Sequence, residues 1–141
     1  MSLTELVTSE QVRPPLEMYD VAIPLQRGLE DLVAAARTLA GAGINIDAVK
    51  CPAFTTPSTC HLLVEDGELA LRALRVAGIG SAACRSVLVY RLPNRPGTLA
   101  RYTQALLNHK VGIDFLYQAT AKGVVIGAPD LDAVRRAFAA A

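Results

Sequence analysis

The stretch DVAIPLQRGLEDLVAAARTLAGAGINID, residues 20–47, decides the fold. It begins with a short β-like run at 21–25 and continues into a segment whose apolar residues recur at helical spacing, which predicts an amphipathic helix. We expect the helix to stop at 41–43, because glycine accepts the left-handed conformation that ends helices. The alternating run 44–49 then predicts a second strand. The apolar face of the expected helix consists of Leu29, Leu32, Val33, Ala36, Leu39 and Ala40.

The same pattern returns 67 residues further along the chain. Self-similarity at one fixed offset predicts two copies of a single supersecondary unit. The offset is longer than the repeats of solenoid proteins, so we interpret the copies as two small domains. Five positions match without a gap and in the same order, Leu25 with Leu92, Leu32 with Leu99, Leu39 with Leu106, Ile46 with Ile113 and Asp47 with Asp114.

The second half of each copy also matches. In the first copy, a strand at 60–64 is followed by the turn Asp66-Gly67 and a helix. In the second copy, a strand at 124–127 is followed by a turn and a helix for which Asp130 is the expected N-cap. The first copy closes with a strand near 82–85, which runs into the first strand of the second copy.

Each copy therefore reads β-α-β-β-α-β, which predicts an α+β fold of two ferredoxin-like βαββαβ modules. We expect antiparallel sheets with helices on one face, and modules paired side by side. The first domain is expected over 19–86 and the second over 87–141, where only three alanines follow Phe138 and the last strand is missing. Residues 1–18 form an N-terminal extension. Its segment 3–12 is expected to add a strand to the open edge of the second domain or to a partner chain.

The composition is that of a folded protein without a strong charge. Of the 141 residues, 52% are hydrophobic and 19% are charged, which excludes global disorder. A net charge of +1 lacks the broad positive field of nucleic-acid-binding proteins, so we expect no nucleic-acid partner. The pairs Arg72/Arg75 and Arg135/Arg136 fall on expected helices, and we interpret them as solvated helix faces.

Targeting and redox signals are weak. No apolar run approaches the ~20 residues of a spanning helix, so we expect no membrane segment. The N-terminus has neither the basic nor the apolar region of a secretion signal. The three cysteines are odd in number and widely spaced, which predicts reduced thiols and a cytoplasmic location. Cys51 and Cys60 could nevertheless be neighbours across the two central strands of the first copy.

A motif in the second copy points to a family. The run Leu92-Pro93-Asn94-Arg95-Pro96-Gly97-Thr98-Leu99, followed by Val111-Gly112-Ile113-Asp114, resembles the ACT domain, a regulatory module of amino-acid metabolism. The resemblance is strong over 87–137 and fair over 19–76, which identifies the chain as a tandem ACT-domain protein. ACT domains usually have no catalytic activity. They pair side by side, and many bind an amino acid in the crevice where two domains meet.

The resemblance also implies a ligand site. In the serine-binding regulatory domain of phosphoglycerate dehydrogenase, an Asn in the turn holds the ligand, and an Asn of the partner domain, just before the Ile of strand two, completes the site. Asn94 matches the first position, but Gly112 stands at the second position of that copy. The first copy has Asn45 at the second position, but its turn reads QRGLE at 26–30. The resemblance thus implies one composite site per chain, made of Asn94, Arg95, Pro96, Gly97, Thr98 and Leu99 with Asn45 and Ile46.

Physical chemistry favours such a turn as well. Pro96 fixes φ and Gly97 relaxes steric limits, so main-chain N–H groups at the start of the next helix are left free. Those groups and the positive end of the helix dipole suit a carboxylate. The amides of Asn94 and Asn45 can accept from an ammonium and donate to a carboxylate, as a zwitterion requires. The alternative is that the motif only makes a tight strand-to-helix turn.

Other motifs favour structural roles. The run 78–83 fits G-x-G-x-x-A, but it follows a helix and precedes a strand, the reverse of the dinucleotide-binding order. His61 lies in an expected strand and His109 at a helix end, and no metal-ligand spacing emerges. No nucleophile–base pair can be placed. We therefore expect no catalytic residue, no metal site and no cofactor.

The sequence thus predicts a non-catalytic regulatory protein that binds a small ligand, a free amino acid, at the interface between its two domains. It would report the ligand to a regulated protein partner or through assembly as a homodimer or higher homo-oligomer. The alternative is a structural oligomerisation and protein-interaction module with no ligand. A small enzyme is the least favoured interpretation.

Overall fold

The chain divides into two compact units. The computed structural model describes residues 13–55, 57–120 and 123–141. One unit comprises residues 17–87, and the other comprises residues 88–141 together with the start of the chain up to residue 16. The segment 3–12, for which we expected an additional strand, lies outside the described residues.

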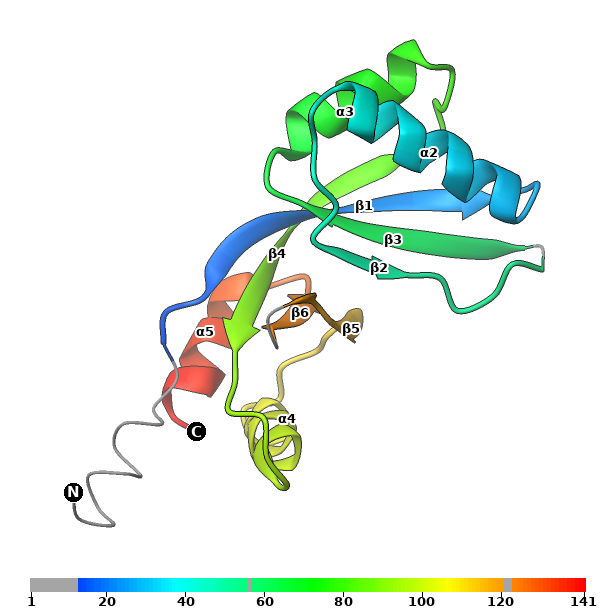
Figure 1. The fold of residues 1–141 in the computed structure, drawn as a ribbon. Coiled ribbons are helices and arrows are strands. Elements are labelled where there is room, and N and C mark those ends of the chain that lie inside the picture. Colours follow the sequence, from blue (N-terminus) through cyan, green and yellow to red (C-terminus); the bar gives the residue numbers. More distant parts are fainter. Residues whose placement is uncertain (1–12, 56, 121–122) are drawn as a thin grey trace. The chain divides into compact units, whose positions relative to one another are not determined.

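Residues 17–87 form an antiparallel sheet with two helices on one face (Figure 1). The strand order is β2-β3-β1-β4, and β1 and β2 both pair antiparallel with β3. In chain order the elements are β1 (Leu16–Leu25), α2 (Leu29–Gly41), β2 (Ala48–Lys50), β3 (Ser58–Val64), α3 (Gly67–Val76) and β4 (Ala83–Arg91).

The core of this unit lies between the sheet and the helices. Alternate residues of β1, among them Val21 and Ile23, are almost fully buried and pack with Ala35 and Leu39 of α2. The apolar face expected for this helix is partly wrong, because Leu29 is 59% exposed. The buried stripe of α2 is therefore narrower than the periodicity alone predicts.

Residues 88–141 form a second sheet with two helices on one face. The strand order is β4-β6-β5, and β6 pairs antiparallel with both neighbours. Three aromatic rings fill its core, since Phe138 lies 4.4 Å from Tyr90 and 5.1 Å from Tyr102 between ring centroids. The elements after β4 are α4 (Thr98–Asn108), β5 (Phe115–Gln118), β6 (Gly123–Gly127) and α5 (Leu131–Ala139).

Main-chain hydrogen bonds repeat between the units at the offset of 67 residues. One bond closes the end of the first helix of each unit, and a second ties the following segment to the neighbouring strand. Gly43 and Lys110, the residues just before the closing donors, both have positive φ, 74° and 55°. The four bonds are Ile44 N to Leu39 O and Val111 N to Leu106 O, both 2.9 Å, Asp47 N to Leu63 O at 2.8 Å, and Asp114 N to Gly127 O at 2.7 Å.

Two strand predictions need correction. The strand expected at 44–49 begins only at Ala48, because the helix-closing bond holds Ile44 at the end of α2. Ile44 and Ile46 still pack on the core, which explains the alternation in the sequence without a β-ladder. The strands expected near 82–85 and at 87–92 are one continuous strand, β4.

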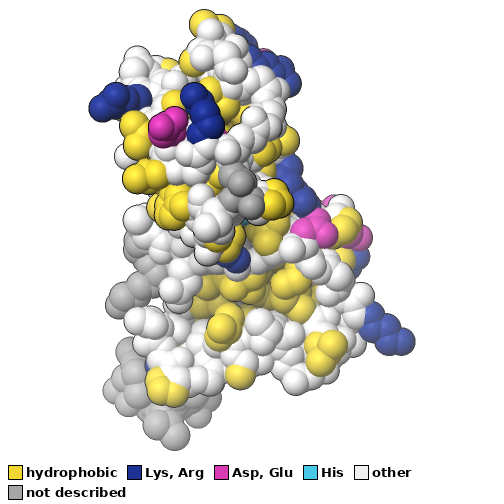
Figure 2. Space-filling model, turned by 90° about the vertical axis from the view of Figure 1, so that its right-hand side faces the viewer, with side chains coloured by type: hydrophobic (Ala, Val, Ile, Leu, Met, Phe, Trp, Pro, Cys, Tyr) yellow, Lys and Arg dark blue, Asp and Glu magenta, His cyan; other side chains and the backbone are white. Residues whose placement is uncertain are grey.

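The surface carries dispersed charge. On the face drawn in Figure 2, the Lys and Arg side chains lie apart from one another. The Arg clusters expected on solvated helix faces do lie there, and two of their members pair with acids of the same helix: Arg72 with Glu68 at 3.2 Å and Arg135 with Asp132 at 2.8 Å. Within the described ranges, no helix combines the length and the hydropathy that a bilayer crossing needs.

Candidate ligand-binding turns

The turn before α4 is open to solvent. Asn94, Arg95, Pro96 and Gly97 are all exposed, Thr98 is half-buried, and the neighbouring Leu99 is 53% exposed. Gly97 is the N-cap residue in the left-handed conformation, with φ 91°. This helix start has no side-chain cap, and its first turn contains no acidic residue.

The turn before α2 is occupied by a carboxylate of its own chain. Asp31 Oδ2 accepts the main-chain N–H of Gln26 at 2.7 Å and that of Arg27 at 2.6 Å. The guanidinium of Arg27 also donates to Asp31 Oδ1 through Nε at 3.1 Å. These hydrogen bonds, the main-chain bond from Arg27 first, hold the pKa of Asp31 below its usual 3.8. The turn is further covered by a loop, since a Cβ at Gly28 would meet the carbonyl oxygen of Phe54 at 2.8 Å.

The two residues expected from the first copy lie between α2 and β2. Asn45 is exposed, and its amide donates to Asp47 Oδ1 at 2.8 Å. Ile46 packs against the helix-side core. The structure thus brings Asn94 to Leu99 together in one turn and places Asn45 and Ile46 in the other unit, so that a site built from both sets stays a prediction.

A buried ion pair lies on the helix-free face of the first sheet. The carboxylate of Asp20, whose side chain is fully buried, contacts Nδ1 of His61 at 2.9 and 3.2 Å. His61 has the structural surroundings that its strand position favoured, while Asp20 was missed because it opens the strand next to ordinary apolar residues. Among the described residues, no group of three or more His, Cys, Asp or Glu side chains could hold a metal ion.

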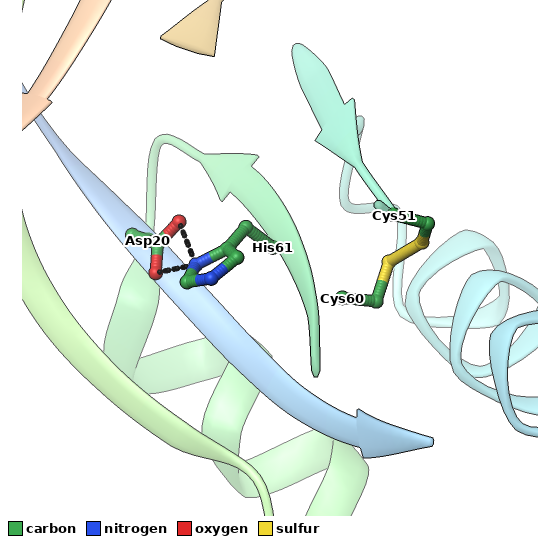
Figure 3. The surroundings of a disulfide bond; sticks show 4 residues. All are labelled: Asp20, Cys51, Cys60 and His61. Carbon is green, nitrogen blue, oxygen red and sulfur yellow. Dashed lines mark hydrogen bonds and ion pairs between the residues drawn. A yellow bond between two sulfur atoms is a disulfide. The ribbon is translucent and has the colours of Figure 1, made fainter. Parts of the chain in front are cut away.

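The expectation of reduced thiols is wrong for two of the three cysteines. Cys51 and Cys60 form a disulfide, while Cys84 is free. Cys60 belongs to the helix-side core, and Figure 3 shows the disulfide on the side of a helix and His61 pointing away from it. The opposite orientation of Cys60 and His61 follows from their adjacent positions in one strand.

Comparison with known proteins defines the fold further. No protein-family model matches the sequence, and no curated protein matches it by sequence. Protein BT0572 from Bacteroides thetaiotaomicron matches in structure with a TM-score of 0.71 and 21% identity, over 88% of this chain and 86% of that chain. The ligand-free regulatory subunit of aspartate kinase from Thermus thermophilus matches with 0.61 and 24%, over 90% and 95%. The corresponding Thermus flavus subunit matches with 0.62 and 20%, over 91% and 96%.

These matches define the class of fold. The chain has the fold of the ACT-containing regulatory domains of aspartate kinase, which confirms the resemblance carried by the motif at 92–99. The α+β class is confirmed with it. At identities of 20–24%, the likeness to these proteins is a likeness of fold.

Proposed function

We propose that this chain is a non-catalytic regulatory protein that binds a free amino acid at one composite site. The turn from Asn94 to Leu99 provides one side of the site, and Asn45 with Ile46 provides the other. The observation that carries the proposal is the contrast between the two turns, one open at a helix start and the other filled by Asp31.

The open turn suits the carboxylate of an amino acid. The first N–H groups of α4 point out of the helix end, where the helix dipole favours negative charge. The amide of Asn94 can donate to the carboxylate and accept from the ammonium of the same ligand. Exposed Leu99 would lie beside the ligand's side chain.

The filled turn supports this assignment. Asp31 places a carboxylate on two main-chain N–H groups at the equivalent helix start, so a turn of this kind binds a carboxylate within this protein itself. Because those donors are already used, we expect one ligand per chain.

The output would pass through other molecules. A ligand regulates only when it favours one state of the protein over another. We propose that the chain assembles as a homodimer or higher homo-oligomer in the cytoplasm, and that amino-acid binding alters this assembly or the contact with a regulated protein. The fold shared with regulatory subunits of aspartate kinase supports a role of this type.

A panel of the twenty common amino acids tests the proposal by thermal shift and calorimetry. One of them should raise the unfolding midpoint, with about 2.7 kcal/mol of stabilisation at a concentration 100-fold above Kd. Asn94→Ala should abolish the shift and leave the unliganded midpoint unchanged. Gln26→Ala, at the filled turn, is the matched control and should keep full binding. The absence of any shift or heat with all twenty would overturn the proposal.

The second candidate is a structural oligomerisation module without a ligand. The exposed apolar residues Leu99 and Leu107 on α4, 53% and 71% exposed, favour a contact surface. Sizing by light scattering separates the candidates, because the module predicts a stable assembly that none of the twenty amino acids alters.

A further inference from the structure

The disulfide extends the pairing of two strands. In the register of β2 and β3, Lys50 lies opposite His61, so the next opposed pair is Cys51 and Cys60. Their Cα atoms are 4.5 Å apart, the spacing of a non-hydrogen-bonded pair in an antiparallel ladder. The covalent bond therefore holds the chain one position beyond the end of β2.

Strand β2 is otherwise weakly held. It contains three residues and lies at the edge of its unit's strand order, with Val49 55% exposed. Before it, the main-chain bond from Asp47 N to Leu63 O ties the chain to β3. Asn45 is fixed by its bond to the carboxylate of Asp47. The position of Asn45 thus depends on the attachment of a short edge strand that the disulfide secures at its far end.

The sulfur atoms differ in accessibility. Cys60 is fully buried in the helix-side core, whereas Cys51 is partly exposed, so a small thiol reaches Cys51 first. Cys84 is a poor competitor, because burial and the nearby charge of Asp20 raise the pKa of its thiol. A protonated thiol is a weak nucleophile. The redox response of the described residues is therefore expected from the Cys51–Cys60 pair.

We propose that Cys51 and Cys60 form a redox switch that fixes β2 and the preceding segment with Asn45 when oxidised and releases them when reduced. Disulfides are rare in the cytoplasm, and those that occur there are usually catalytic or redox-sensing. The effect on amino-acid affinity rests on the proposed function. The effect on β2 stands independently of it.

The chemistry is thiol–disulfide exchange with a low-molecular-weight thiol. Its thiolate attacks Cys51 Sγ, the bond between the two protein sulfurs breaks, and Cys60 leaves as a thiolate that takes up a proton. A second thiol displaces Cys51 from the mixed disulfide. In total, two small thiols are oxidised to one small disulfide while the protein disulfide is reduced to two thiols. Oxidation of the pair by a small disulfide is the reverse sequence.

Hydrogen exchange followed by mass spectrometry tests the release of β2. The Cys84→Ala variant of the full chain leaves only the Cys51–Cys60 pair, and alkylation before mass measurement reports its redox state. Reduction with dithiothreitol should accelerate exchange at residues 44–50 by about tenfold, since local opening sets the rate there. Exchange in α4, in the other unit, should not change. Cys51→Ala in the same background should exchange rapidly with and without reductant.

Binding provides the second arm. The amino acid that shifts the unfolding midpoint should bind the reduced chain at least about fivefold more weakly than the oxidised chain. An equal Kd in both redox states would overturn the control of binding. If none of the twenty amino acids binds either form, the proposed function fails while the exchange arm still decides the switch.

Two outcomes would overturn the switch itself. One is equal exchange at residues 44–50 in the oxidised and reduced chains. The other is recovery of both thiols in free form after incubation with oxidised glutathione, which would mean that the pair does not form a bond under oxidising conditions.

Discussion

Asp31 and Thr98 are equivalent positions in the two units, separated by the common offset of 67 residues. The carboxylate of Asp31 accepts two main-chain N–H groups of its turn. Thr98 carries a neutral hydroxyl, and the helix that it begins has no side-chain cap. One side chain therefore separates a filled turn from an open turn, a difference that the count of asparagines alone did not predict.

Replacing Asp31 should destabilise the chain in a pH-dependent way. A carboxyl group whose pKa is lowered by folding stabilises the folded state above its unfolded pKa, here near 3.8, and loses that effect as the pH falls through its folded value. Urea unfolding should show Asp31→Ala as less stable than the wild type at about pH 7, with a smaller difference at about pH 3. Asp132→Ala, which removes an acid paired with the side chain of Arg135, is the control. A difference of equal size at both pH values would contradict the assignment.

His61→Ala tests the buried ion pair. The variant removes the partner that contacts both oxygens of the buried Asp20 carboxylate. A buried charge that loses a partner is costly, so we expect a loss of about 1–3 kcal/mol in the free energy of unfolding. His109→Ala, at an exposed helix end, should lose less. A neutral result for His61→Ala would mean that the pair does not stabilise the fold.

At the scale of elements, helices were easier to predict from the sequence than strands. Asp130 caps its helix as expected, since its carboxylate accepts from Ala133 N at 3.0 Å, and Asp66 does the same for Leu69 N at 3.0 Å. These caps depend on residues three positions apart, which a sequence displays directly. The start of β2 depends on a partner strand fourteen or more positions away along the chain, and the alternation of Ile44 and Ile46 reports burial without reporting a ladder.

Gly127→Ala tests the packing of β5 against β6. A Cβ at this position would meet the Phe115 ring, with two ring carbons at 2.6 Å, and that ring is stacked on Tyr117. Overpacking of this kind should lower the free energy of unfolding by about 1–3 kcal/mol. Gly112→Ala is the control, because nothing lies within 4 Å of its added Cβ. Equal midpoints in urea for the two variants would show that the Phe115 ring moves aside freely.

At the scale of the whole molecule, the internal repeat and one turn motif predicted the class of fold, which the matches to regulatory subunits of aspartate kinase confirm. The disulfide was not predicted, because the pairing of Cys51 with Cys60 depends on a strand register across an intervening loop. The loop at Phe54 that covers the first turn has no counterpart of equal length in the second copy, so the repeat gave no sign of it. The composite site joins two units, and the sequence supplies only its parts.

Loss of the disulfide should lower global stability. Closing a loop of nine residues' separation restricts the unfolded chain by about 2–3 kcal/mol in the chain-entropy account. Urea unfolding of Cys51→Ala in the Cys84→Ala background should show this loss relative to Cys84→Ala alone without reductant. With dithiothreitol present, the two proteins should unfold at nearly the same urea concentration. A persistent difference would assign the loss to packing of the Cys51 side chain.

Strand β4 runs without interruption from Ala83 to Arg91, while the division between the two units falls between Val87 and Leu88. Domain boundaries usually fall in exposed linkers, where proteases cut and where genes tolerate insertions. Here both residues at the division are fully buried. Expression fragments divided at this point would each begin or end in the middle of a strand. Halves intended for separate study should therefore both carry the whole of β4, and the natural places to open the chain lie elsewhere.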